Sequence, residues 1–158
     1  MTHYVCGFMF SGDYKQVLLI KKKRPDWQAG KWNGIGGHVE DSDESPAHAM
    51  AREFREETGV ETAPGDWRFM AQYYEADQHG SNIVVVDFYF TRNSWAYLSA
   101  RTVTDEQVSG WAVLDVFSDW KGETLLPNIP TLIGHAIGTA YSGFTLDPLE
   151  FDNSPHKL

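Results

Sequence analysis

Residues 36–60 have the sequence GGHVEDSDESPAHAMAREFREETGV, and this stretch decides how the rest of the chain is interpreted. A helix is predicted to begin near Ser45-Pro46, because serine is a favoured N-cap residue and proline suits the first helical position. The helix is predicted to end at Thr58-Gly59, since glycine readily adopts the left-handed conformation found just after many helices. Residues 25–45, rich in Gly, Pro, Asp and Ser, are predicted to be mostly loop.

Three carboxylates share one face of this predicted helix. At about 100° per residue, Glu53, Glu56 and Glu57 point the same way. The apolar face that can pack on a sheet holds Ala47, Met50, Ala51, Phe54 and Thr58. Neighbouring carboxylates repel one another, so a divalent cation would stabilise them. Mg²⁺ favours carboxylates together with waters and phosphate oxygens. The alternative interpretation is an ordinary solvated acidic face.

Two neighbouring features strengthen the metal interpretation. The pair Gly36-Gly37 allows backbone to approach a ligand or metal closely. Arg52 precedes Glu56 by one helical turn and can pair with an acid, which would hold the carboxylates in place. A zinc site is not expected, because the chain has no cysteine pair and no histidines at zinc-ligand spacing.

Composition limits the class of protein. The 158 residues, 42% of them hydrophobic, suit a single domain over residues 1–158. The net charge of −9 argues against a nucleic-acid polymer as partner, but allows a small phosphorylated substrate bound through divalent cations. No apolar run approaches the roughly 20 residues of a membrane helix, and no secretory signal is present. With Cys6 as the only cysteine, expected to be buried, we expect a cytoplasmic protein without membrane attachment.

The remaining hydrophobic pattern predicts an α/β fold. Strands are predicted at 4–10, 16–20, near Ile35, and at 67–75, 83–91 and 111–116, with a second helix at 130–142. The strand over 83–91 is apolar on both faces, as in the centre of a sheet. Strands interleaved with two helices indicate a mixed sheet flanked by helices. Residues 143–158 are expected to be a peripheral, partly loose tail.

Residues 37–60 resemble the Nudix box, in which a glycine, five residues, a glutamate and seven residues precede Arg-Glu-apolar-x-Glu-Glu-x-Gly-apolar. The matching positions are Gly37, Glu44, Arg52, Glu53, Phe54, Glu56, Glu57, Gly59 and Val60. Six residues rather than five separate Gly37 from Glu44, and Asp43 replaces the usual glycine, so the loop is expected to bulge by one residue there. The resemblance implies a Nudix-type α/β/α sandwich.

The same resemblance implies roles for the box residues. Glu53, Glu56 and Glu57 would ligate Mg²⁺, or Mn²⁺, with the Gly37 carbonyl as a further ligand. Glu44 and Arg52 would form a supporting pair. One of the helix acids, or a downstream acid, would deprotonate the attacking water. The downstream candidate is Glu106, for which an ordinary exposed loop acid is the alternative.

A narrower resemblance concerns the substrate. Residues 31–37, KWNGIGG, are similar to the lead-in of MutT-type and oxidised-purine nucleoside triphosphatases, as is Pro127-Asn128 ahead of the second helix. Asn33 and Asn128 would therefore read a purine edge, although Asn33-Gly34 also suits a turn. Trp32, and as weaker candidates Trp27 and Trp120, would stack on a base. Lys23 and Arg24 would contact phosphate oxygens, or simply form a solvated strand end.

These resemblances imply a magnesium-dependent pyrophosphohydrolase that converts a nucleoside triphosphate, including oxidised forms such as 8-oxo-dGTP, into a monophosphate and pyrophosphate. One alternative is hydrolysis of ADP-ribose, a dinucleoside polyphosphate or another nucleoside diphosphate derivative. Another is a Nudix-fold regulator that binds nucleotides without hydrolysis, although such a protein would be expected to lack box glutamates. A homodimer formed through an exposed strand edge is compatible with the sequence.

Overall fold

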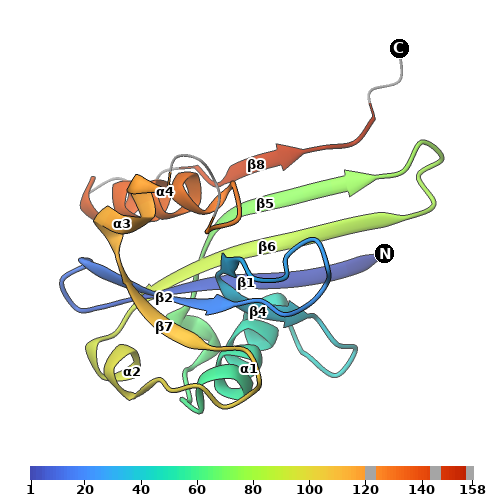
Figure 1. The fold of residues 1–158 in the computed structure, drawn as a ribbon. Helices are drawn as coiled ribbons and strands as arrows, with labels where there is room; N and C mark the ends of the chain where they lie inside the picture. Colours follow the sequence, from blue (N-terminus) through green and yellow to red (C-terminus); the bar gives the residue numbers. More distant parts are fainter. Residues whose placement is uncertain (120–123, 143–146, 156–158) are drawn as a thin grey trace.

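The computed structural model describes residues 1–119, 124–142 and 147–155. These residues form one mixed eight-stranded sheet with helices on both faces (Figure 1). The strands are β1 (Thr2–Phe10), β2 (Gln16–Lys21), β3 (Trp32–Asn33), β4 (Ile35–His38), β5 (Arg68–Ala76), β6 (Ile83–Arg92), β7 (Val108–Ala112) and β8 (Leu149–Asp152). The helices are α1 (Pro46–Thr58), the 3₁₀ turn η1 (Pro64–Asp66), α2 (Ser94–Ser99), α3 (Val113–Ser118) and α4 (Ile129–Tyr141). The predicted α/β class is confirmed.

The sheet is built around the parallel pair β1 and β6. Its order is β3-β2-β1-β6-β5-β8, with β4 pairing with β1 and β7 pairing with β2. β6 lies between β1 and β5, as its apolar faces predicted. In register, Gly37 of β4 lies opposite Val5 of β1, and Val5 lies opposite Asp87 of β6. The short strand carrying the double glycine is therefore attached directly to the central strands.

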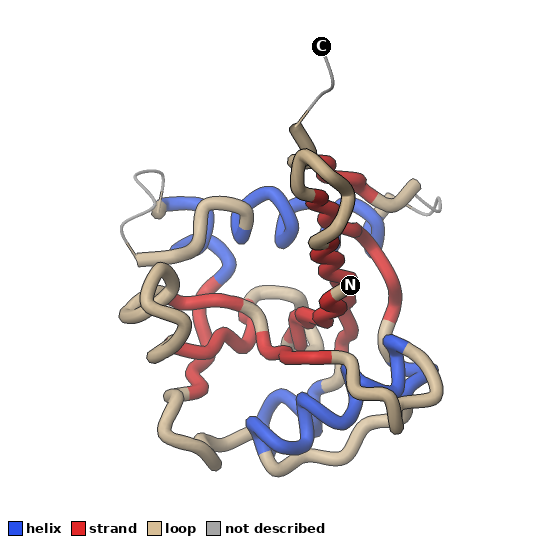
Figure 2. The backbone as a smooth tube through the Cα atoms, turned by 90° about the vertical axis from the view of Figure 1, so that its right-hand side faces the viewer, coloured by secondary structure: helices blue, strands red, loops and turns tan. Residues whose placement is uncertain are grey.

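Two apolar cores lie on the two faces of the sheet. One core packs α1 and α2 on the sheet through Met50, Phe54 and Ala96. The other packs α3 and α4 on the opposite face through residues such as Val116 and Leu132. Figure 2 shows the helices above and below the strands. Each fully buried side chain of this kind stabilises the fold by about 1.5–3 kcal/mol, so both layers are firmly attached.

Helix α1 begins and ends where the sequence predicts. The Ser45 side chain accepts a hydrogen bond from the backbone N–H of His48, and Pro46 follows at the first helical position. Gly59 ends the helix with φ of 77°, in the left-handed region. These two boundaries fix which helix residues face the sheet.

The structure corrects three expectations. The strand predicted at 111–116 is wrong, because β7 ends at Ala112 and α3 begins, burying Val113 and Val116 at helical spacing. Helix α2, capped by the Asn93 side chain, was not predicted. The predicted peripheral tail contains a strand that was not predicted, since β8 pairs in parallel with β5 at the edge of the sheet. The candidate Trp120 lies outside the described residues.

The structure also bears on the predictions for Cys6 and for membrane helices. Cys6 is buried, and burial raises the pKa of its thiol to about 12, so it is the unreactive side chain that the sequence predicts. In the described parts of the chain, no helix is long and apolar enough to cross a membrane.

Candidate active site

The acidic face of α1 lies against the glycine strand β4. A Cβ atom built on Gly37 would fall 2.5 Å from the carboxylate of Glu53. A side chain at position 37 would displace the Glu53 carboxylate, so glycine allows the two to lie this close. Glu53 is buried at this contact, whereas Glu56 is exposed one turn further along the helix. Burial raises the pKa of Glu53, and the hydrogen bond and charge of Arg52 offset only part of that effect.

Arg52 joins the acids to the loop before the helix. Its Nη1 donates to Glu53 Oε1 at 2.9 Å and to Glu56 Oε2 at 3.2 Å. Its Nη2 donates to the backbone carbonyl of His38 at 2.8 Å, and its Nε and Nη2 hold both oxygens of Asp43 at 3.0 and 2.9 Å. One guanidinium therefore fixes three carboxylates and one carbonyl in a single arrangement.

The supporting acid is Asp43, and the predicted Glu44–Arg52 pair is wrong. The Glu44 side chain is 82% exposed and contacts His48 at 3.1 Å. The backbone N–H of Asp43 bonds Glu40 O, while the N–H of Glu40 bonds the Asp43 carboxylate. This hydrogen-bonded turn places the Asp43 carboxylate beside the Arg52 guanidinium. Glu44 lies directly before the N-cap, and its side chain points away from Arg52. Five residues separate Gly37 from Asp43, as in the Nudix box, while eight rather than seven separate Asp43 from Arg52, so the extra residue lies after the aspartate.

A second loop, residues 101–107, reaches the other end of the acidic face. The backbone N–H of Arg101 bonds Thr58 O at 3.1 Å, which fixes the loop to the end of α1. The Thr104 hydroxyl then donates to Glu57 at 3.0 Å and accepts the Glu106 backbone N–H at 3.2 Å. Thr104 thus links the backbone of Glu106 to the carboxylate of Glu57 at the end of the acidic face.

Glu106 is not the exposed loop acid of the alternative interpretation. It is 4% exposed, and its two carboxylate oxygens accept from Lys22 Nζ at 2.9 Å and from the Lys23 backbone N–H at 2.6 Å. Burial alone would raise the pKa of Glu106, but these donors lower it below the usual value. Glu57 differs: burial raises its pKa, and the Thr104 bond and the Lys22 charge offset only part.

The donor set fits a hard divalent cation. Glu53, Glu56, Glu57 and the Gly37 backbone supply only oxygen ligands, which Mg²⁺ and Mn²⁺ prefer. Among residues 1–119, 124–142 and 147–155, no three His, Cys, Asp or Glu side chains form a ready-made metal cage. Arg52 and Thr104 hold the acids instead. Mg²⁺ needs no all-protein cage, because it completes its shell with water and phosphate oxygens.

The predicted substrate-binding residues differ in how far other residues of the protein already occupy their side chains. Lys23 and Arg24 lie exposed at the end of β2 and both contact Asp105, at 3.9 and 2.7 Å. The Asn33 amide is committed within the protein: its oxygen accepts from the Gly34 N–H at 2.7 Å and from the Cys6 thiol at 3.7 Å, and its nitrogen donates to Gln28 at 3.2 Å. These contacts occupy the Asn33 amide within the protein, and Asn33 itself lies in strand β3, so the predicted turn at Asn33-Gly34 is wrong.

The remaining aromatic and amide candidates lie at the outer edge of the sheet. Trp32 packs edge-on against Trp111, with ring centroids 5.6 Å apart, and its backbone bonds Thr124 and Leu126. Asn128, two residues further on, is exposed, and its side chain makes no capping bond to α4. Trp27 is exposed on the loop after β2. Among these candidates, Asn128 presents an amide that the helix start does not use.

Three functional residues were missed from the sequence. Asp43 was identifiable by counting five residues from Gly37. Lys22 belongs to the basic run 21–24, but only its contact with Glu106, 84 positions away, distinguishes it. Thr104 carries no sequence signal, because its role depends on where its loop docks.

Comparison with known proteins identifies the family of the chain. The NUDIX domain family matches residues 2–121, so the chain belongs to the Nudix family. Over 52 residues it is 42% identical to the CTP pyrophosphohydrolase of Escherichia coli (strain K12), a match covering 33% of this chain and 38% of that protein. The aligned part is thus well under half of that relative's length.

Solved structures share the fold. The NUDIX domain of Shewanella oneidensis NrtR, complexed with ADP ribose, superimposes with a TM-score of 0.69 at 20% identity over 87% of each chain. A MutT protein from Bacillus halodurans gives a TM-score of 0.66 at 16% identity over 98% of this chain and 92% of that chain. The predicted family and sandwich architecture are confirmed.

Proposed function

We propose that this protein is a metal-dependent pyrophosphohydrolase that splits a nucleoside triphosphate into a nucleoside monophosphate and pyrophosphate. The observation that carries the proposal is the acidic face of α1, packed on Gly37 at one end and joined through Thr104 to Glu106 and Lys22 at the other. Carboxylates for a cation and an ammonium for phosphate oxygens then border the same site, as hydrolysis of a charged diphosphate requires.

Glu53, Glu56, Glu57 and the Gly37 carbonyl would hold Mg²⁺ or Mn²⁺. A bound ion of this kind neutralises phosphate oxygens and lowers the pKa of water from about 15.7 toward neutrality. Arg52 orients Glu53 and Glu56 by hydrogen bonds to their carboxylates. Its guanidinium is itself held by the Asp43 carboxylate and the His38 carbonyl. Lys22 places a positive charge at the border of the site.

Glu57 is a better proton acceptor than Glu106 in this arrangement. Both oxygens of Glu106 already accept strong hydrogen bonds, and its pKa is lowered, so it holds charge without readily taking a proton. Only one Glu57 oxygen accepts the Thr104 hydroxyl. Glu57 therefore has more room than Glu106 to accept a proton from water.

The identity of the base is the finer part of the proposal. Asn128 is the available amide for reading a base, because the Asn33 amide is bonded internally. The likeness to a CTP pyrophosphohydrolase supports a triphosphate substrate and adds a pyrimidine to the purines, including 8-oxo-dGTP, suggested by the subgroup resemblance.

A second candidate substrate is a nucleoside diphosphate derivative such as ADP-ribose. The fold is shared with the NrtR domain whose solved complex holds ADP ribose. A nucleotide-binding role without hydrolysis is disfavoured, because all three helix glutamates are present.

The test is product analysis with Mg²⁺ on a panel of CTP, the other nucleoside triphosphates, 8-oxo-dGTP, ADP-ribose and diadenosine polyphosphates. We expect monophosphate and pyrophosphate from triphosphates, and a loss of about 10²–10⁴-fold in kcat for Glu57→Gln. Glu61→Gln is the matched control, since Glu61 lies just past α1 and pairs with exposed Arg55. Turnover of ADP-ribose alone would establish the second candidate, and full activity of Glu57→Gln would overturn the site assignment.

A further inference from the structure

A buried carboxylate lies in the centre of the sheet, separate from the acids of α1. Asp87 belongs to β6, between β1 and β5, and is only 6% exposed. Its Oδ2 lies 2.7 Å from His3 Nε2, and its Oδ1 accepts a hydrogen bond from Gln72 Nε2 at 2.7 Å. Among the residues that the structure describes, no lysine or arginine pairs with Asp87. Because an unpaired buried carboxylate is costly, Asp87 depends on His3 of β1 and Gln72 of β5.

This polar cluster lies on the face of the sheet that α1 covers. Alternate residues of a strand point to the same face, so His3 shares its face with Val5, and Asp87 shares its face with Tyr89. Val5 and Tyr89 both belong to the apolar core beneath α1. Val5 also lies opposite Gly37, so β1 alone separates the strand of Asp87 from the glycine strand β4.

The start of β1 holds the end of β4 in place. Of the described strands, only β1 pairs with β4. A backbone bond just beyond β4 runs from the Val39 N–H to the His3 carbonyl at 2.8 Å. His3 is the second residue of β1, and the end of a strand opens readily unless a contact ties it down. The His3 side chain supplies that contact, because it joins β1 to Asp87 of β6.

The end of β4 carries two parts of the candidate metal site. The Gly37 carbonyl is a proposed metal ligand, and Gly37 packs against the Glu53 carboxylate. The His38 carbonyl accepts a hydrogen bond from Arg52 Nη2 at 2.8 Å, while Arg52 Nη1 holds Glu53 at 2.9 Å. A shift of this strand end would therefore move one ligand directly and move Glu53 through Arg52.

We propose that His3 is a positioning residue for the metal site, because its bond with Asp87 ties down the start of β1 and so fixes the end of β4. The inference rests on the proposed function, since it takes Gly37 and Glu53 as metal ligands. Gln72 bonds the same carboxylate but belongs to β5, which pairs, of the described strands, only with β6 and β8. Gln72 should therefore stabilise Asp87 without positioning the site.

Amide hydrogen exchange of the metal-free protein tests the anchor without any turnover. In His3→Ala, the Val39 N–H should exchange about tenfold faster than in the wild type, the lower end of what a hydrogen bond to a charged group contributes. Gln72→Ala is the matched control, because it removes the other hydrogen bond to Asp87. It should lower Tm about as much as His3→Ala while changing Val39 exchange less than about twofold.

Binding of Mn²⁺ without substrate tests the positioning role, with free Mn²⁺ followed by electron paramagnetic resonance. His3→Ala should raise the Kd about fivefold, the low end of the coupling between linked sites. His3→Gln should stay within about twofold of the wild type, because the glutamine amide can donate to Asp87 in place of the histidine ring. Gln72→Ala should leave the Kd unchanged.

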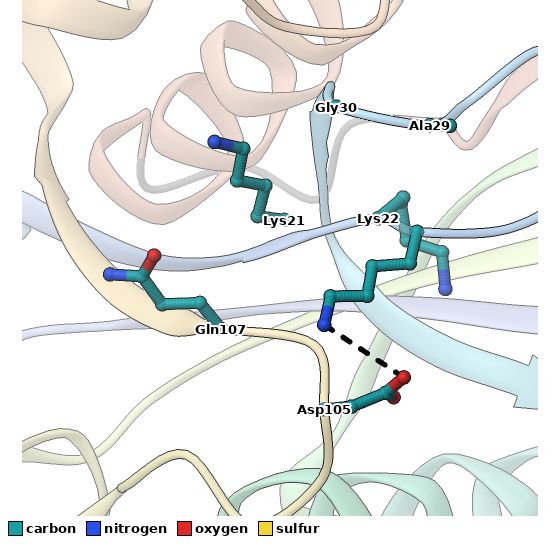
Figure 3. Close-up of a pocket in the computed structure, with 7 residues that line it drawn as sticks. Lys21, Lys22, Ala29, Gly30, Asp105 and Gln107 are labelled. Atoms are coloured by element: carbon teal, nitrogen blue, oxygen red, sulfur yellow. Dashed lines mark ion pairs between the residues drawn. The ribbon is translucent and has the colours of Figure 1, made fainter.

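A second control separates positioning from charge. Removing a basic side chain cannot weaken cation binding through charge alone, since it makes the protein more negative. Lys21→Gln is this control, because the exposed Lys21 lies on β2 and lines a pocket with Gly30 and Gln107 (Figure 3). Its Mn²⁺ affinity should be unchanged or slightly stronger, in contrast to the weaker binding expected of His3→Ala.

Two results would overturn the proposal: unchanged Val39 exchange and Mn²⁺ affinity in His3→Ala, or equal changes in Gln72→Ala and His3→Ala. Either result would leave the proposed function standing, because hydrolysis by the wild type does not depend on it. If the wild type binds no Mn²⁺, the metal site of the proposed function fails instead. Faster Val39 exchange confined to His3→Ala would then still support the anchor at the start of β1.

Discussion

Replacing Asp43 by asparagine should destabilise the protein, whereas replacing Glu44 by glutamine should not. The Asp43 and Arg52 side chains are 7% and 15% exposed, and two hydrogen bonds of 2.9 and 3.0 Å join them. Hydrogen bonds to charged groups contribute about 1.5–3 kcal/mol each. Asparagine keeps one acceptor, and Arg52 retains Glu53, Glu56 and the His38 carbonyl. We therefore expect a loss of about 2 kcal/mol, near the low end of that range.

Urea unfolding and thermal melting measure this difference. For a chain of this size, about 2 kcal/mol corresponds to a fall in Tm of roughly 4–8 °C. Glu44→Gln is the matched control and should stay within about 0.5 kcal/mol of the wild type, because Glu44 is exposed. A loss of stability in Glu44→Gln that equals or exceeds that of Asp43→Asn would refute the assignment of Asp43 as the partner of Arg52.

The pH dependence gives a second readout of the same pair. Arg52 lowers the pKa of Asp43, so this carboxylate stabilises the fold fully above its unfolded pKa of about 3.9. The contribution is lost as the pH falls from there through the lower folded value. Wild type and Asp43→Asn should therefore differ most near neutral pH and converge in acid. A constant difference down to the acid transition would contradict this account.

Three further changes are informative. Gly37→Ala should lower the free energy of unfolding by about 1 kcal/mol, the low end of overpacking costs, but remove most of the activity, because the new methyl group displaces the carboxylate end of the Glu53 side chain. Gly65→Ala, with open space around it, is the control by melting and product assay. Mg²⁺ at about 100 times its Kd should stabilise the wild type by roughly 2.7 kcal/mol in thermal melting, and Glu57→Gln much less. Phe151→Ala should lower the free energy of unfolding by about 1–2 kcal/mol, because the Phe151 side chain is only partly buried against the core. A fully buried phenylalanine would cost about 3–5 kcal/mol. Glu150→Ala, at an exposed position of the same strand, should leave the free energy of unfolding unchanged.

The parts of the fold that depend on local pattern were predictable. Ser45, Pro46 and Gly59 mark the ends of α1, and the apolar residues of 83–91 mark a central strand. Residues 111–116 misled because a short, mostly apolar segment, interrupted only by Asp115, suits both a strand and a short helix. Here the helix α3 is the form that buries Val113 and Val116 together.

The residues of the site also divide into those that local sequence spacing predicts and those that it does not. The three glutamates were predictable because their spacing alone puts them on one helix face. The contacts of Lys22 with Glu106 and of Thr104 with Glu57 join residues 84 and 47 positions apart. Such contacts follow from how loops dock on the finished sheet, which no local periodicity encodes. Asp43 was only partly predictable. Its spacing from Gly37 matches the box, but the box has a glutamate at this position, and this favoured Glu44.

The arrangement of charges also indicates that the protein folds without its metal. Arg52 balances Glu53 and Glu56 at one end of the acidic face, while Lys22 pairs with Glu106 at the other. A cation is therefore not needed to relieve carboxylate repulsion, in contrast to small zinc domains that unfold when the metal is removed. EDTA should abolish hydrolysis while leaving the far-ultraviolet circular dichroism unchanged, and Mg²⁺ should restore the rate. Loss of the dichroism signal in EDTA would show that Arg52 and Lys22 do not suffice to hold the acids together.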